Sequence, residues 1–215
     1  MAIKLNGSTS GSVALDAPAD TSPSGTDVTL TLPTSAGSSG QYLQTNGSGV
    51  LSWQTVTDTG TQWTDGTRQT LSGTDITFSS IPSNVILIQI TILEMSFNGA
   101  SDLRIRLGDS GGEESTGYMG RAYATTSVKQ MTTDAFGFEY TNAASYIYSG
   151  QIRIFNHDSN DWFSEGRVFQ ENANDYMGYT GRKTLSDQLT QVRLFASGGH
   201  SFDSGSVTLH YLTSS

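Results

Sequence analysis

The chain has 215 residues, of which 35% are hydrophobic and 14% charged, with 24 glycines and no cysteine. This length accommodates one compact domain with an appendage, and the missing cysteines exclude disulfides and thiolate metal sites. The formal net charge of -9, without a dense Lys/Arg cluster, argues against nucleic-acid binding, because affinity for phosphate backbones requires concentrated positive charge.

Residues 1–57 are predicted to form an extended arm of short β-ribbons. The first residues contain no apolar stretch of signal-peptide length, so the sequence gives no sign of secretion by that route. Apolar residues alternate with threonine at 28–32, and further short apolar pieces at 42–43 and 51–53 flank Asn46-Gly47, which favours a tight hairpin. Ribbons this short cannot bury enough surface alone to offset the entropy of ordering the chain. The arm therefore requires a partner, most simply copies of itself.

The remaining chain is predicted to be a linker, 58–70, followed by a β-rich domain, 71–215. The linker is polar with one large aromatic residue, Trp63, whereas the domain carries one strand pattern after another and no window with a 3.6-residue period. The run 86–93 is β-branched and suited to burial on two faces, and it is far shorter than the roughly 20 apolar residues of a membrane span. Turn residues separate the strands at spacings typical of a sandwich or barrel. The expected fold is therefore all-β: an antiparallel, jelly-roll-like β-sandwich preceded by the β-ribbon arm.

No catalytic motif is found, so we do not expect an enzyme. The hydrolase elbow needs a central serine, but the nearest match, 7–11, has threonine there, and the glycine motifs of nucleotide-binding proteins are missing. The three histidines lack the spacing of metal ligands, so neither a metal nor a cofactor is expected. Neighbouring carboxylates at 113–114 and 158–161 lie in predicted loops, where such groups are usually solvated rather than paired for glycoside cleavage.

The most polar loop of the domain is 156–162. Its oxygen-bearing residues at alternate positions are similar to the start of a calcium loop, although the glycine and the distal glutamate of that pattern are missing; the same residue types favour an ordinary hairpin tip. Aromatic rings beside amides and carboxylates suit sugars or protein epitopes, because the ring covers C–H surface while the polar groups bond hydroxyls. About half of the rings in polar segments are expected in the core or a subunit interface instead. The predicted contact patch consists of Asp158, Asn160, Asp161, Trp162, Tyr176 and Tyr179.

Several short motifs follow one another along the chain. They are GSVALDAPA at 11–19, VTLTLP at 28–33, SGQYLQTNGSGVLSW at 39–53, FSSIPS at 78–83, LRIRLG at 103–108, STGY at 115–118 and FDSGSVTLHY at 202–211. The order of the first three resembles a segment that recurs in tail-fibre and other virion proteins of bacteriophages. The others are similar to a β-rich terminal domain of phage tail proteins, and residues 120–190 match only loosely.

This resemblance implies a virion protein, commonly a homotrimer, that is made and folded in the cytoplasm of the bacterial host before assembly. Its arm would join other tail or capsid proteins, and its carboxy-terminal domain would bind a receptor or polysaccharide on the host cell by multivalent contact. The expected function is thus host attachment by a tail fibre-like appendage. The alternatives are a capsid decoration protein and a small tailspike depolymerase, whose usual long parallel solenoid does not fit so short a chain. In a trimeric arm, three chains would share an axial core of Val28, Leu30, Leu32, Leu43 and Trp53.

Overall fold

A computed structural model describes residues 3–6, 12–15, 19, 24–25, 27–56, 60–125, 127–139 and 143–214. These residues form β-strands, turns and one short 3₁₀ helix, Ser197–Gly199. The described part of the chain contains no helix long and apolar enough to cross a membrane. The predicted all-β class is confirmed. The chain divides into two compact units, Met1–Asp58 and Thr59–Ser215.

The first unit contains two antiparallel hairpins. They are β1 (Ile3–Asn6) with β2 (Ser12–Leu15), and β3 (Gln41–Thr45) with β4 (Leu51–Thr55). Both hairpins are short. The predicted strand pieces 42–43 and 51–53 lie in the second hairpin, whereas the sequence pattern predicts no strand at the positions of β1 and β2.

The loop between β3 and β4 is longer than the tight turn expected from Asn46-Gly47. The side-chain oxygen of Asn46 accepts hydrogen bonds from the backbone N–H groups of Ser48 and Val50, at 2.9 and 3.2 Å, and these bonds stabilise a wider loop. Val50 also forms a parallel bridge with Thr31, which holds the extended segment 27–33 against the start of β4.

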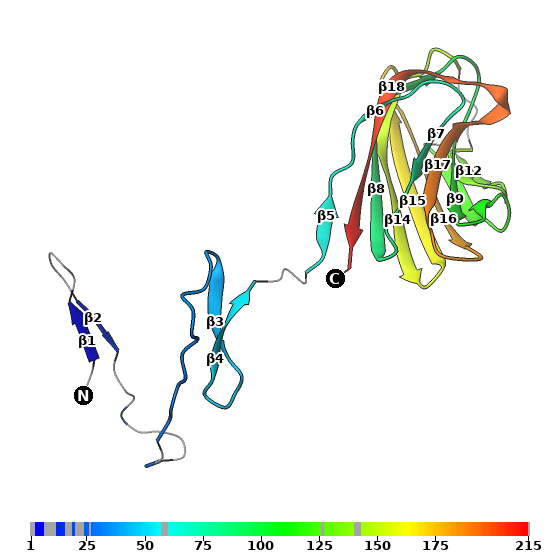
Figure 1. The fold of residues 1–215 in the computed structure, drawn as a ribbon. Coiled ribbons are helices and arrows are strands. Elements are labelled where there is room, and N and C mark those ends of the chain that lie inside the picture. The colour runs from blue at the N-terminus through cyan, green and yellow to red at the C-terminus, as the bar shows by residue number, and fades with distance from the viewer. Residues whose placement is uncertain are drawn as a thin grey trace. The chain divides into compact units, whose positions relative to one another are not determined.

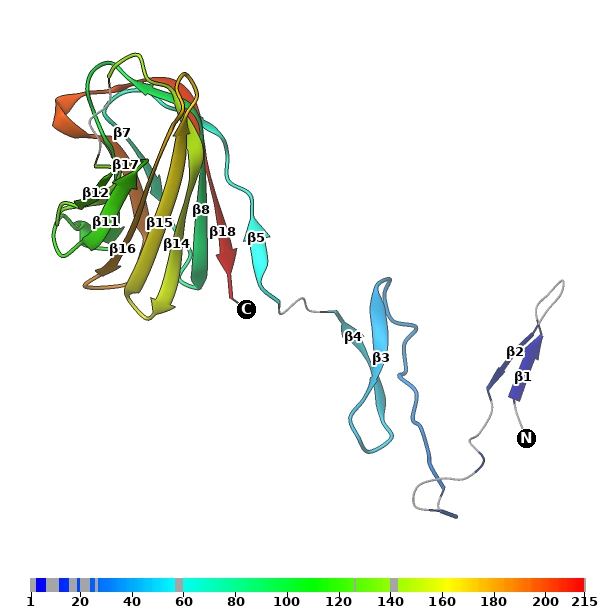
Figure 2. The same cartoon turned by 180° about the vertical axis from the view of Figure 1, so that it is seen from behind.

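The second unit is built on a large antiparallel sheet (Figures 1 and 2). Its strands in spatial order are β12 (Ser127–Gln130), β11 (Met119–Ala124), β16 (Asp175–Thr184), β15 (Asp161–Gln170), β14 (Tyr148–Asp158), β8 (Val85–Phe97), β18 (Phe202–Thr213) and β5 (Gln62–Thr64), with β6 (Gln69–Thr70) also paired to β18. The segment 58–70, assigned to a linker from the sequence, therefore contributes two short strands beside β18.

A smaller antiparallel sheet packs on one face of the large sheet. Its strands in order are β10 (Gly112–Glu113), β9 (Leu103–Asp109), β17 (Gln191–Ala196) and β7 (Asp75–Ser79), with β13 (Phe136–Gly137) also paired to β9. Apolar side chains of both sheets form one buried cluster: Ile90, Ile152 and Leu209 are cross-strand neighbours in the large sheet, and Ile105 pairs with Leu194 in the small one. This arrangement is consistent with a β-sandwich.

Strand β8 is buried on one face, whereas its sequence predicts burial on two. Ile88 and Ile92 are fully buried, but Gln89 and Thr91 on the opposite side are only partly buried and Leu93 is 45% exposed. The reason is that the small sheet covers one side of the large sheet only. The uncovered side, which we call the outer face, carries the outward side chains of β18, β8, β14, β15, β16 and β11.

Candidate functional site

The predicted contact residues do not form a single patch. Asp158, Asn160 and Asp161 lie at the tip of the β14–β15 hairpin, where Asp158 pairs with Asp161. Tyr176 is 52% exposed but lies at the other end of β15, where it pairs with Phe169. The ten residues of β15 span roughly 30 Å at about 3.3 Å per residue, so Tyr176 cannot share a small ligand with the hairpin tip.

Trp162 and Tyr179, also predicted as contact residues, are buried at 3% and 0% exposure. Both side chains face the small sheet. The Tyr179 hydroxyl lies 2.8 Å from the Ser164 hydroxyl, and its ring stacks on Phe136 and meets Phe138 edge-on. Burial raises the pKa of Tyr179 above its ordinary value. These two aromatic residues stabilise the core, because the pleat of β15 and β16 turns them away from the solvent side.

The outer face instead carries four arginines. Arg153 on β14, Arg167 on β15, Arg182 on β16 and Arg121 on β11 all project to this side and are exposed. None of them forms an ion pair with another described residue. In the middle of these four strands, Glu165 is the one outward-facing carboxylate among the described residues. The outer face is therefore locally cationic in a protein of net charge -9.

The arginines of the small sheet are neutralised, in contrast to those of the outer face. Each has a carboxylate within 3.0 Å, which is the usual arrangement for guanidinium groups that hold a fold together. The pairs are Arg104 with Glu139 at 2.8 Å, Arg106 with Asp134 at 3.0 Å, and Arg193 with Glu113 at 2.8 Å and Asp75 at 3.0 Å.

Asp102 lies beside the first of these pairs. Burial raises the pKa of its carboxyl group to about 6, although Arg104 at 3.6 Å acts in the opposite direction. One carboxylate oxygen of Asp102 and the Nε of Arg104 have no hydrogen-bond partner among the described residues. The ionised carboxylate of Asp102 is thus expected to destabilise the fold, because it is buried and only partly compensated by Arg104.

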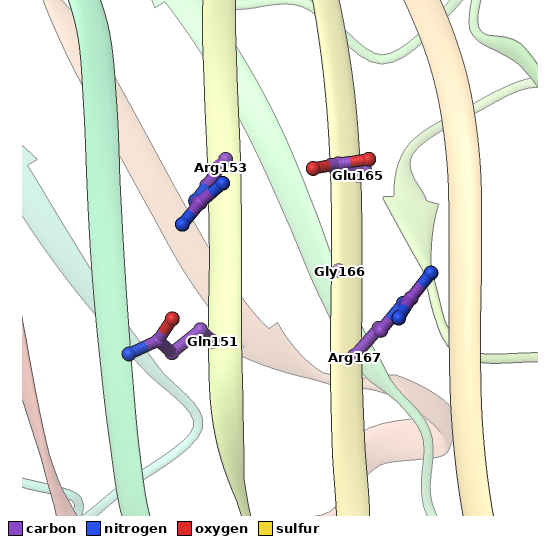
Figure 3. A pocket seen from close by; sticks show the side chains of 5 residues that line it. All are labelled: Gln151, Arg153, Glu165, Gly166 and Arg167. Carbon is purple, nitrogen blue, oxygen red and sulfur yellow. The ribbon is translucent and has the colours of Figure 1, made fainter.

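A shallow hollow of about 300 Å³ lies in the middle of the outer face (Figure 3). Gln151 and Arg153 project into it from β14, and Glu165 and Arg167 project from β15, around Gly166. The strand register places Gln151 opposite Arg167 and Arg153 opposite Glu165. Arg153 and Arg167 therefore lie diagonally across the strand pair, with the Arg167 side chain turned toward β16 and the Gln151 side chain turned toward β8 (Figure 3).

Aromatic rings flank this polar centre toward the β14–β15 hairpin tip. Phe155 and Phe163 form a tilted pair with ring centroids 6.4 Å apart, and they line a hollow of about 370 Å³ together with Arg182. A further hollow of about 330 Å³ shares Phe163 and Arg182 and adds Met119 and Arg121. Guanidinium groups and apolar surface thus alternate across four strands.

A glycine extends this surface across β16. Gly178 lies between Arg167 and Tyr123 in the strand register, and a Cβ atom at this position would collide with the Tyr123 ring. The missing side chain lets the ring of Tyr123 lie over β16 on the outer face. A tyrosine hydroxyl is thereby added to the arginines of the neighbouring strands.

The sequence contained one indication of this face. Arg153 alternates with the buried Ile152 and Ile154, a period of two that places a cation on the side opposite the core. The four arginines are far apart along the chain, so they form no local cluster in the sequence and come together only through the pairing of the strands.

Comparison with known proteins adds no functional residue. No protein-family model, no curated protein and no solved structure matches the chain. Within the described ranges there is also no group of three or more His, Cys, Asp or Glu side chains that could hold a metal ion. What the outer face can do follows from its own chemistry: guanidinium groups bind anions, rings cover C–H surface, and amides and hydroxyls bond hydroxyls.

Proposed function

We propose that this protein is an adhesive structural protein of a virion, a tail fibre-like appendage. Its first unit associates with copies of itself and with the particle, and its second unit, a jelly-roll-like sandwich, contacts the host surface through a receptor or polysaccharide. The observation that carries the proposal is the exposure of apolar side chains in the first unit. Val28, Leu30, Leu32 and Leu43 are between 42% and 68% exposed.

Exposed apolar residues on so small a unit favour association. Burial of apolar surface stabilises by roughly 25 cal/mol per Å², and an isolated two-stranded hairpin is at best marginally stable. Val28, Leu30 and Leu32 follow one another at alternate positions, so they share one side of the extended segment 27–33. Three copies meeting along this side would cover all of them.

Trp53 contributes to the arm in a different way from the other predicted core residues. Its indole N–H donates to the Ser35 carbonyl at 2.8 Å, and its ring packs so closely on Gly37 that a Cβ there would come within 2.6 Å. Trp53 therefore orders the first unit within one chain, while the exposed leucines and valine remain for contact between chains.

The mass of the full chain in solution tests this association. Native mass spectrometry should give three times the single-chain mass of 23.0 kDa, and Leu30→Ser combined with Leu32→Ser should shift the protein toward single chains. Val128→Ser is the matched control, because Val128 is 69% exposed on the second unit. A single-chain mass for the unmodified protein at micromolar concentration would overturn the proposed trimer.

The position on the particle tests the appendage role. Gold-labelled antibodies against this protein should mark the tail of virions that carry it and should block their adsorption to cells. A label spread over the capsid at high copy number would contradict the appendage and favour a decoration protein.

A further inference from the structure

We infer that the outer face of the large sheet binds an acidic polysaccharide of the cell surface, one whose negative groups are the carboxylates of uronic acids. This inference rests on the proposed attachment function and names the ligand class of its second unit. The ligand is assigned from charge, from hydrogen-bonding groups and from the position of the aromatic rings.

The positive charge of the outer face favours an anionic partner. Four of the eight arginines in the sequence lie here without a carboxylate partner among the described residues, whereas those of the small sheet are paired. Arg153, Arg167, Arg182 and Arg121 come from four adjacent strands, so their like charges lie near one another. An anion bound between them would relieve this repulsion and would accept charge-assisted hydrogen bonds, which guanidinium groups form well with carboxylates.

The polar groups between the arginines indicate a ligand with hydroxyls and only occasional charge. Glu165 lies opposite Arg153 in the middle of the face, where it would repel a polymer with a charge on every unit, such as a nucleic acid or a phosphate chain. The same carboxylate accepts hydrogen bonds from hydroxyl groups. Gln151 and Thr180 add neutral hydrogen-bonding groups on either side. A glycan that alternates carboxylates with hydroxyls matches this pattern.

Apolar surface borders the polar centre at both ends of the strands. Phe155 and Phe163 lie on one side, and Phe169 and Tyr176, which are 54% and 52% exposed, lie on the other. Sugar rings present C–H faces that pack on such aromatic rings while their hydroxyls reach the polar groups between them. Because the three hollows are open and lie on neighbouring strands from β14 to β11, they suit a run of sugar units rather than one enclosed sugar.

The test uses the full chain and three probes that carry one carboxylate per disaccharide: hyaluronan, heparosan and chondroitin without sulfate. Calorimetry should detect binding to at least one of them, and this binding should weaken as sodium chloride is raised. Methyl esterification of that probe, which removes the charge but keeps the sugars, should weaken binding by roughly tenfold or more.

Variants locate the site. Arg167→Gln and Arg153→Gln should each lower the affinity for the carboxylate probe by roughly tenfold, since each removes a charge-assisted hydrogen bond. Arg68→Gln is the control: Arg68 is exposed, bonds the Ser206 hydroxyl of β18 and lies two strands beyond β14, away from the three hollows, so its loss of charge should leave binding unchanged. Thermal melting of all three variants checks that each is folded.

Several results would overturn the inference. They are the absence of binding to all three probes, equal binding of the methyl ester, equal effects of the Arg167 and Arg68 variants, and tighter binding of poly(glycerol phosphate) or single-stranded DNA than of any carboxylate probe. None of these outcomes would alter the mass of the assembled protein or its position on the virion, so the ligand inference and the proposed appendage role fail separately.

Discussion

Replacing Asp102 by asparagine should remove a pH-dependent loss of stability. Burial raises the pKa of this carboxyl group from 3.8 to about 6 in the folded protein. Because one pKa unit corresponds to about 1.4 kcal/mol, the ionised group destabilises the fold by about 3 kcal/mol. Below about pH 4 the group is protonated in both the folded and the unfolded chain and has no such effect. Between about pH 4 and pH 6 the unfolded chain loses its proton first, so the free energy of unfolding falls as the pH rises, and the loss persists at higher pH.

Urea unfolding of both proteins, followed by circular dichroism at equal protein concentration, measures this effect. The stability of Asp102→Asn relative to the unmodified protein should rise by up to about 3 kcal/mol between about pH 4 and pH 7. Arg104 keeps Glu139 as its partner in the variant. The hydrogen bond from the Ser186 hydroxyl lowers the pKa of Asp109. This shift is the same in both proteins, so it does not contribute to the difference between their free energies of unfolding.

Two outcomes would refute this reasoning. Parallel pH profiles for the two proteins would mean that Asp102 ionises with the same pKa in the folded and the unfolded chain. A variant that is less stable than the unmodified protein above about pH 6 would mean that attraction to Arg104 outweighs the burial of the carboxylate.

Four further substitutions test the core and the outer face. Tyr179→Phe should lower the free energy of unfolding by about 1 kcal/mol, through the lost hydroxyl contact, and should leave polysaccharide binding intact; weakened binding would place this ring on the ligand side. Glu114→Ala should destabilise by about 3 kcal/mol, and Lys183→Met by less, because the first leaves the buried ammonium of Lys183 without its carboxylate. Urea unfolding measures the free energy of unfolding of both variants, and a larger loss for Lys183→Met than for Glu114→Ala would contradict this explanation. Gly178→Ala should displace the Tyr123 ring and weaken binding of the carboxylate probe while the melting temperature changes little; calorimetry showing unaltered affinity would remove Tyr123 from the binding face.

The sequence alone determined the fold class and most strand positions. Leu103, Ile105 and Leu107 alternate with arginines, and Ile152 and Ile154 alternate with polar residues, and all five lie in the strands β9 and β14. Such alternation is readable locally because successive side chains of a strand point to opposite faces. The exposed apolar residues of the first unit were likewise foreseeable from the short ribbons.

Which face of a strand is covered was decided by tertiary structure. Trp162 and Tyr179 lie in polar stretches that predict exposure, yet both are buried, and the run 86–93 predicts burial on two faces, yet one of them is open. The covering sheet is assembled from β7, β9 and β17, which come from separate parts of the chain. The residues of a large-sheet strand therefore do not by themselves show which of its faces the small sheet covers.

The cationic outer face is a second consequence of tertiary structure. An excess of acidic residues over the whole chain, with no dense basic cluster, gave no reason to expect an anion site. Antiparallel pairing of β11, β14, β15 and β16 nevertheless places Arg121, Arg153, Arg167 and Arg182 on one side of adjacent strands, while most acidic residues lie elsewhere. Electrostatic attraction depends on distance in space rather than on separation along the chain, so the net charge follows from composition and the local charge follows from the fold.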